Sequence, residues 1–262
     1  SLFKRLGGLE IQENILDKKV VMIGVGSVGS TASAQLVKAG IRDLVLIDPD
    51  QLEVHNIIRH LCDLTDLGRF KADAVREKLL GVNPNLTIKM VKNDFVKDYE
   101  KIEKHLNNID LLVVSTDTPE SRQLANIVSI ELNIPVVYIS LHERARSGSI
   151  YRVIPGKTGC RHCIGDGQWG NEFIPGSTDY SKRSDERDIL FQPGLDTDIN
   201  LVTMLGVRMA ISTLLHPEAD ISPELSTNYL YWNGYPEDGQ SMISLVDGLG
   251  IPKNEDCEVC GD

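Results

Sequence analysis

Three glycines near the start of the chain separate an apolar run from a segment with helical spacing. They are Gly24, Gly26 and Gly29, and they follow the apolar residues 19–23. Glycine allows a tight turn, lets the backbone approach a phosphate and lets a helix pack closely on its strand. Because a helix N-terminus carries free N–H groups and a partial positive charge, this turn predicts an anion site. Glycine turns also have purely structural uses, so the prediction depends on the residues that follow.

A carboxylate lies where a ribose contact is expected. The second apolar run, residues 44–47, ends at Asp48. In dinucleotide-binding folds an acidic residue about 20 positions beyond the glycines hydrogen-bonds a ribose. Together, the strand, the glycine turn, the helix and Asp48 predict a nucleotide site.

The next segment changes the predicted nucleotide from a nicotinamide dinucleotide to ATP. Its polar residues are Asp48, Asp50, Glu53, Asn56, Arg59 and Lys71. Their spacing, D-x-D-x-x-E-x-x-N-x-x-R followed by G-x-x-K-A, resembles the ATP-binding signature of the ThiF/MoeB-like and ubiquitin-activating enzymes. The resemblance extends from Gln12 to Cys260. A nicotinamide-dependent oxidoreductase would use the glycines and Asp48 but would leave the remaining polar residues without a role.

The resemblance implies a role for each matching residue around the nucleotide. Asp48 would hold the ribose hydroxyls, and Asn56 would contact the nucleotide. Asp50 matches a second acid, which we assign to the nucleotide or its metal.

It also implies the residues that handle charge. Arg59 and Lys71 would bind phosphate oxygens, and Asp117 would hold Mg²⁺, so we expect these three to be catalytic. Asp117 follows an apolar run at 109–115 and precedes Pro119. The alternative is that Asp117 only caps the helix that starts there.

The five cysteines form two C-x-x-C pairs and one isolated residue. The pairs are Cys160 with Cys163 and Cys257 with Cys260, and the remainder is Cys62. Two separated C-x-x-C turns can supply four thiolates to one tetrahedral Zn²⁺, and the family resemblance includes both pairs. We therefore predict a structural zinc site. Two disulfides or a redox pair are the alternatives.

Two residues that are typical of the family are missing at their usual places. Many members carry a nucleophilic cysteine before the helix expected at 195–215, but there is no cysteine between Ile164 and Ile251. Cys62 could replace it, although we expect Cys62 to be a buried packing residue. An arginine found upstream of the Gln12 position in the family is also missing. Arg5 is the nearest substitute, with a solvated surface arginine as the alternative.

The elements that must position these residues alternate along the chain. We expect strands at 19–23, 44–47, 86–91, 109–115, 134–139 and 148–154, with helices at 30–39, 68–80, 98–106, 119–132 and 195–215. Two closing strands are expected at 228–232 and 241–246. This order predicts an α/β fold of the Rossmann-like, doubly wound type, with a mainly parallel sheet, an antiparallel extension and a structural zinc site.

Composition limits the classes of partner. The 262 residues carry a formal net charge of −11, without a long basic run, so we expect no nucleic-acid partner. No stretch approaches the roughly 20 apolar residues that cross a bilayer, so we expect no membrane partner and a cytoplasmic location.

We expect one adenylation domain over residues 1–262. The start at Ser1, without a methionine, is consistent with a fragment of a longer protein. Residues 165–193 are rich in Gly, Ser and charged residues, and we expect a mobile loop that crosses the active site.

These features predict ATP-dependent adenylation of a carboxylate. The resemblance implies that the acyl substrate is the C-terminal tail of a ubiquitin-like or sulfur-carrier protein, or a peptide. It also implies a homodimer or a second activating subunit as partner. The alternatives are a non-catalytic partner subunit of such an enzyme and an NAD-dependent oxidoreductase.

Overall fold

The computed structural model describes residues 2, 4, 14–165, 194–216, 227–234 and 250–261. Gln12, Arg5, the predicted strand 241–246 and the predicted loop beyond Gly165 lie outside the described residues.

The described chain is organised around one seven-stranded sheet with the order β3-β2-β1-β4-β5-β6-β7. Pairing is parallel from β3 to β5 and antiparallel from β5 to β7. The strands are β1 (Lys19–Ile23), β2 (Asp43–Ile47), β3 (Thr87–Val91), β4 (Leu111–Val114), β5 (Val136–Leu141), β6 (Ser147–Val153) and β7 (Tyr229–Asn233). The predicted parallel sheet with an antiparallel extension is therefore confirmed.

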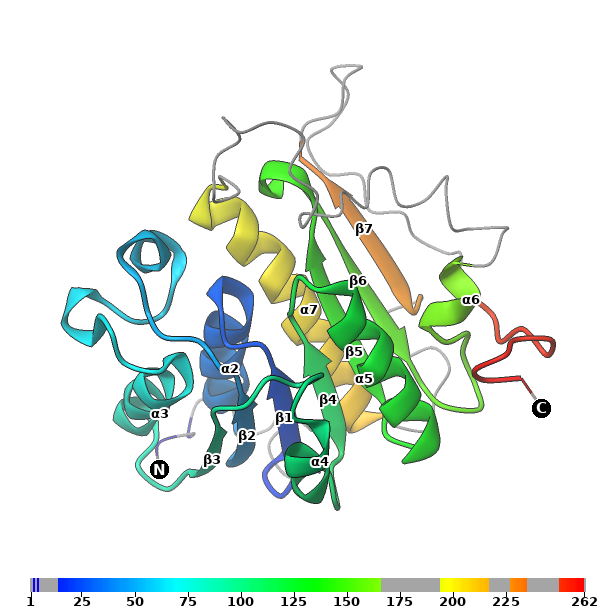
Figure 1. The fold of residues 1–262 in the computed structure, drawn as a ribbon, viewed down its shortest axis with the longest axis horizontal. Coiled ribbons are helices and arrows are strands. Elements are labelled where there is room, and N and C mark those ends of the chain that lie inside the picture. The colour runs from blue at the N-terminus through cyan, green and yellow to red at the C-terminus, as the bar shows by residue number, and fades with distance from the viewer. Residues whose placement is uncertain are drawn as a thin grey trace.

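Helices cover both faces of this sheet (Figure 1). The helices are α2 (Ser27–Ala39), α3 (Lys71–Val82), α4 (Tyr99–Ile102), α5 (Pro119–Glu131), α6 (Arg161–Gly165) and α7 (Asp196–Leu215). Short 3-10 helices lie between them, namely η2 (Val54–Arg59), η3 (Leu64–Asp66) and η4 (Glu103–His105), and the segment η5 (Glu143–Ala145) after β5 is a turn with a non-helical backbone. Alternate residues of each buried strand point to opposite faces, so the sheet has two hydrophobic cores.

One core packs α2, α3 and α7 against the sheet, and the other packs α4, α5 and α6. On β1, for example, Val20 and Met22 belong to the first core, while Val21 and Ile23 belong to the second. All four are fully buried. A parallel strand that is apolar on both faces is typical of a sheet covered by helices on both sides.

Helix α7 corrects the expectation that no segment is apolar enough to cross a bilayer. This helix has 20 residues, and an 18-residue window of it has a mean hydropathy of 1.3, so length and composition alone would allow a membrane span. In the fold, α7 packs against α2, β5 and β6 and buries Val202, Met209 and Ala210, among others. Its apolar character is therefore explained by its place in the core.

Three predicted helices differ in extent. The helix predicted at 30–39 begins three residues earlier, at Ser27. The helix predicted at 68–80 begins at Lys71, because Gly68 has a left-handed backbone (φ +79°) and Phe70 forms a bridge with Gln51. The helix predicted at 98–106 is only α4 followed by η4.

Candidate nucleotide and zinc sites

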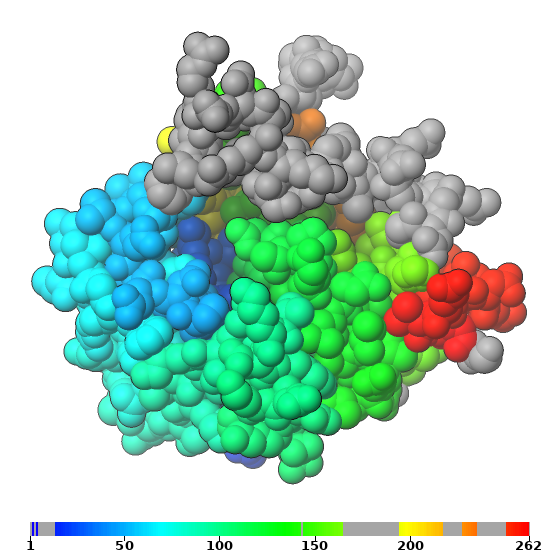
Figure 2. Space-filling model, in the orientation of Figure 1, coloured from blue at the N-terminus to red at the C-terminus, as the bar shows by residue number. Residues whose placement is uncertain are grey.

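A cavity of about 620 Å³ opens at the carboxyl ends of the parallel strands. Figure 2 shows the hollow between a light blue and a green part of the surface, with dark blue atoms of the N-terminal region at its floor. Its lining includes the predicted residues Gly24, Gly26, Asp48, Asp50, Asn56, Arg59, Lys71 and Asp117. Tertiary structure therefore brings together residues that lie up to 93 positions apart.

The glycine turn joins β1 to α2 at this cavity. Gly24 has φ +87°, and a Cβ there would lie 3.0 Å from Thr116 Cγ2, so only glycine fits without strain. Gly26 is the N-cap residue of α2 and has no atom within 4 Å of a built Cβ. No side-chain hydrogen bond caps α2 among the described residues. The free N–H groups of α2 can therefore approach an anion.

Gly29 was predicted to bind the nucleotide, but it is not among the residues that line the cavity. A Cβ at Gly29 would lie 2.0 Å from the carbonyl oxygen of Gly24 and 2.7 Å from Ser115 Oγ. The third glycine therefore allows close packing of α2 on its strand, which is the structural role expected for it.

Asp48 is buried and bonded to the backbone of the turn. Its Oδ2 accepts a hydrogen bond from Val25 N–H at 2.6 Å, and its Oδ1 accepts one from Asp50 N–H at 2.9 Å. Burial raises the pKa of Asp48, while the charge of Lys71 and the two N–H donors oppose that rise. Each oxygen keeps a lone pair, so the carboxylate can hold the turn and still accept a hydrogen bond from a hydroxyl group.

Lys71 lies at the start of α3 and forms an ion pair with Asp50. The Nζ–Oδ2 distance is 2.7 Å, and the Lys71 N–H also donates to the Asp50 carbonyl at 2.9 Å. The Lys71 side chain is 12% exposed, whereas that of Asp50 is 63% exposed. A lysine with a weakly held, solvated partner can exchange that partner for a phosphate.

Asn56 and Arg59 lie on η2, which has no buried residue. Asn56 Oδ1 accepts a hydrogen bond from Glu53 N–H at 3.0 Å and so helps to close the first turn of η2. Arg59 is the last residue of the same short helix. Both side chains therefore reach the cavity from a surface segment and not from the core.

Asp117 is exposed and lies three residues beyond the end of β4. The N-cap residue of α5 is Thr118, so the alternative prediction that Asp117 caps α5 is wrong. An exposed carboxylate at the mouth of a polar cavity suits Mg²⁺, which prefers oxygen ligands and keeps several waters.

His60 is a site residue that sequence reasoning missed. Its Nδ1 accepts a hydrogen bond from Cys62 N–H at 3.1 Å, which assigns the proton to Nε2. Nε2 then donates to the carbonyl oxygen of Val25, 2.8 Å away. Burial lowers the pKa of His60, which favours this neutral tautomer. Its position next to Arg59 was the only sequence signal, because the contact to Val25 spans 35 residues.

Cys62 is a buried packing residue, as predicted. It is 3% exposed and belongs to the core that contains α2 and α3. Burial, together with the negative charge of Asp66, raises the pKa of the Cys62 thiol to about 12. A thiol with this pKa is almost fully protonated at neutral pH and is a poor nucleophile.

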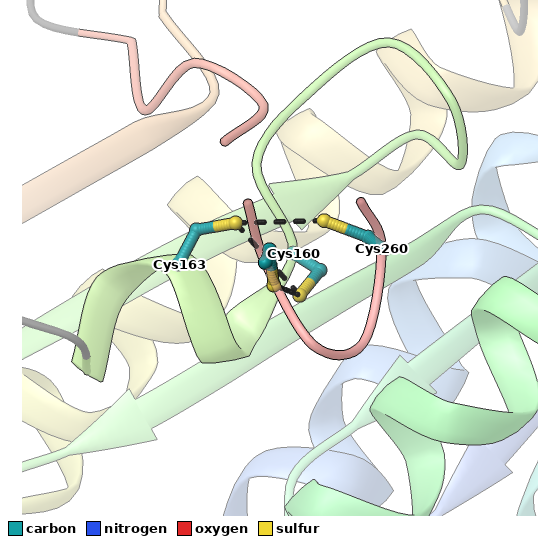
Figure 3. Close-up of side chains that lie close together, drawn as sticks. Cys160, Cys163 and Cys260 are labelled. Atoms are coloured by element: carbon teal, nitrogen blue, oxygen red, sulfur yellow. Dashed lines mark hydrogen bonds between the residues drawn. The ribbon is translucent and has the colours of Figure 1, made fainter. Parts of the chain in front are cut away.

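The two C-x-x-C pairs converge at the other end of the sheet (Figure 3). The sulfur atoms of Cys160, Cys163, Cys257 and Cys260 all lie within 4.8 Å of one another. Three of the separations are 3.5, 3.7 and 4.0 Å. Zn–S bonds of about 2.3 Å place tetrahedral sulfurs about 3.8 Å apart, so this cluster fits zinc. All four cysteines are free thiols, and the separations are too long for the disulfide alternative.

Two chain segments that lie 97 positions apart in the sequence build this cluster. The peptide N–H of Arg161 donates to Asn126 Oδ1 at 2.8 Å, which ties the first pair to α5. Gly159 N–H donates to the Ile251 carbonyl at 2.9 Å, which holds the C-terminal segment beside the end of β6. The cluster therefore connects the C-terminus to the sheet.

Sequence comparison matches this chain to known proteins over most of its length. The sequence model of the ThiF family matches residues 2–242. Ubiquitin-like modifier-activating enzyme 5 of Caenorhabditis elegans is 32% identical over 171 residues, covering 62% of this chain and 41% of that protein. The Oryza sativa subsp. japonica protein of the same name is 28% identical over 238 residues, covering 87% and 55%. This chain spans about half the length of these curated relatives.

Solved structures share the fold. The structure of Escherichia coli MccB with ATP superposes with a TM-score of 0.73 at 23% identity, covering 96% of this chain and 69% of that one. The microcin C7 biosynthetic enzyme MccB in complex with N-formylated MccA gives 0.73 at 22% identity, covering 96% and 70%. At these identities the likeness establishes the three-dimensional fold.

Proposed function

Because the chain belongs to the ThiF family, we propose that it uses ATP to adenylate the carboxyl terminus of a ubiquitin-like protein, a sulfur-carrier protein or a peptide. The observation that carries this proposal is the convergence of the glycine turn, Arg59, Lys71 and Asp117 on one cavity. The curated relatives are named as activating enzymes for a ubiquitin-like modifier, and MccB has been crystallised with ATP and with MccA. These names support the substrate classes proposed here.

The glycine turn and α2 bind the nucleotide in this proposal. The N–H groups at the start of α2 face the phosphates, and the open space at Gly26 lets the backbone approach them. Asp48 fixes the turn through Val25 and offers its remaining lone pairs to the ribose. His60 donates a hydrogen bond to the carbonyl oxygen of Val25, so the peptide units on both sides of Val25 are held in place before the nucleotide binds.

The reaction depends on positive charge near the phosphates and does not need a protein base. A substrate carboxylate is already ionised at neutral pH, and one of its oxygens attacks the α-phosphorus while the bond to pyrophosphate breaks. Arg59 and Lys71 offset the negative charge that builds up on the phosphate oxygens. Asp117 would hold Mg²⁺, which neutralises charge on the leaving pyrophosphate when bound. The acyl group of the adenylate then passes to an acceptor thiol or amine, and AMP leaves.

The zinc cluster has a structural part in this proposal. Four cysteine ligands would fill the tetrahedral shell and leave no open position for a substrate. Cys160, Cys163, Cys257 and Cys260 would therefore hold Zn²⁺ to fasten the C-terminal segment, at a distance from the adenylation chemistry.

ATP–pyrophosphate exchange tests the proposal directly. Peptides that end in glycine should support exchange when the terminal carboxylate is free, and the same peptides with an amidated C-terminus should not. ATP binding without exchange for any tail would favour the non-catalytic partner subunit instead. Reduction of NAD by the protein, with no binding of ATP, would favour the oxidoreductase.

A further inference from the structure

The cavity has a second wall that the nucleotide residues do not use. It lies at the carboxyl end of β5 and at the start of α7, and its residues are Leu141, His142, Ala145 and Ile199. Strand β5 is parallel to β4, and β4 lies between β5 and β1, the strand that leads into the glycine turn. The residues assigned to the nucleotide lie on the β1, β2 and β4 side, and residues 93–96 line the cavity beyond β2. The β5 wall is the opposite side of the same cavity, and we consider it for the acyl substrate.

His142 is the polar side chain of this wall with an unsatisfied group. Its Nε2 is buried and has no hydrogen-bond partner among the described residues. The ring packs against Tyr231, with 5.9 Å between ring centres and 39° between ring planes. A buried polar atom without a partner is unfavourable, so a hydrogen bond to a ligand would relieve that cost.

The imidazole is neutral under physiological conditions. Burial, together with the positive charge of Arg122, lowers the pKa of His142 to about 4. A neutral N–H can donate to a carboxylate or carbonyl oxygen without forming an ion pair. The oxygen that must attack the phosphorus then keeps more of its negative charge than it would beside an arginine.

The turn that carries His142 is held in an unusual backbone conformation. Arg144 and Ala145 both have positive φ, 57° and 53°, which non-glycine residues adopt only at a cost. Two hydrogen bonds close the turn, from His142 N–H to the Ser147 carbonyl and from Ala145 N–H to the His142 carbonyl. A built Cβ at Gly194 would lie 2.9 Å from Ala145 Cβ, so the chain before α7 presses directly on the turn. Packing therefore fixes where His142 meets the cavity.

We propose that His142 binds the carboxyl-terminal end of the acyl substrate, with an imidazole N–H donating to a carboxylate or carbonyl oxygen of the tail. This inference rests on the proposed adenylation. In this inference the β5 wall of the cavity binds the acyl group, and the β1 and β2 side binds the nucleotide.

Two probes separate the acyl contact from the nucleotide contact. Sulfamoyladenosine carries the nucleoside without an acyl group, and N-acetylglycyl sulfamoyladenosine is a stable mimic of a glycyl-adenylate. Calorimetry gives the Kd of each probe for the whole chain. The Kd of sulfamoyladenosine divided by the Kd of N-acetylglycyl sulfamoyladenosine measures how much affinity the acyl group adds. His142→Phe keeps a ring against Tyr231 but removes the donor, and His142→Gln keeps a donor.

In His142→Phe we expect the ratio to fall by about five- to tenfold, the range of one neutral hydrogen bond, and in His142→Gln to stay within about twofold of the unaltered protein. The Kd of sulfamoyladenosine should be the same in all proteins. His105→Ala, a histidine on η4 outside the cavity lining, should change neither value.

An unchanged ratio in His142→Phe would overturn the inference and leave the proposed function intact. If sulfamoyladenosine itself failed to bind the unaltered protein, the proposed function would fail and the inference with it.

Discussion

At the scale of single residues, Arg59 and Lys71 carry the most direct test of the proposed chemistry. Replacing either by alanine should lower ATP–pyrophosphate exchange roughly 100- to 1,000-fold, the effect of losing one preorganised donor to the transition state. Thermal stability should change little, because Arg59 lies on a helix without buried residues and the Lys71 ion pair has an exposed partner. Lys101→Ala, which removes an exposed ion pair outside the cavity, is the matched control. Exchange at normal rates in both cavity variants would rule out their proposed roles.

His142 also gives a pH prediction, which does not depend on any substrate. Its pKa is lowered from an ordinary 6.5 to about 4 in the folded state, so the unfolded chain binds this proton more readily. The stability that His142 contributes is therefore fully present above pH 6.5 and is lost as the pH falls toward 4. The free energy of unfolding should decrease over this window, and His142→Gln should make the decrease shallower. Denaturant titrations at several pH values measure both slopes, and identical slopes would contradict the assignment.

At the scale of elements, we expect that Gly24, the first glycine of the turn between β1 and α2, cannot be replaced by a larger residue without a loss of stability. Gly24→Ala should destabilise the fold by about 1–2 kcal/mol, because the left-handed backbone disfavours a Cβ. ATP binding should weaken as the turn shifts against Thr116. Gly81→Ala is the matched control, since a Cβ there has no atom within 4 Å and Gly81 lies in the helical conformation of α3. That variant should be as stable as the unaltered chain or more stable.

The junction between the first C-x-x-C pair and the C-terminal segment should depend on metal. We expect about one zinc per chain after purification under reducing conditions. Cys160→Ser should lose the metal and lower the melting temperature, because the metal would no longer join the first pair to residues 257–260. Cys62→Ala should retain zinc, since Cys62 lies outside the cluster. Elemental analysis that finds no zinc, together with two disulfides by mass spectrometry, would contradict the zinc site.

At the scale of the whole molecule, the distribution of cysteines predicts the fate of the acyl group. The sequence has no cysteine between Ile164 and Ile251, the Cys62 thiol is buried with a pKa of about 12, and the other four sulfurs lie together in the cluster that fits zinc. The acyl group should therefore leave this chain as the adenylate, without a thioester.

Mass spectrometry after incubation with ATP, Mg²⁺ and a glycine-ended tail tests this directly. Cys62→Ala should retain adenylate formation. An adduct on Cys62 that forms at the rate of turnover, and whose loss stops transfer, would make Cys62 catalytic and contradict the expectation.

Much of the fold follows from local sequence patterns alone. Apolar runs such as 19–23 and 44–47 predict their strands because the central strands of a parallel sheet are apolar on both faces. The glycine turn and the C-x-x-C pairs are equally local, since each needs only neighbouring residues to produce its geometry. The sequence by itself therefore determined the fold class, the residues of the nucleotide segment and the four cysteines of the cluster.

The tertiary structure decided what each residue contacts. Gly29 packs under Gly24 and not against the cavity, and Asp48 is bonded to the turn, because β1, β2 and β4 meet at one edge of the sheet. His142 has no sequence signal of a role, and the only sequence signal for His60 is its position next to Arg59. Their contacts, to Val25 and to Tyr231, join residues 35 and 89 positions apart, and only the folded chain brings such residues within hydrogen-bonding or van der Waals distance.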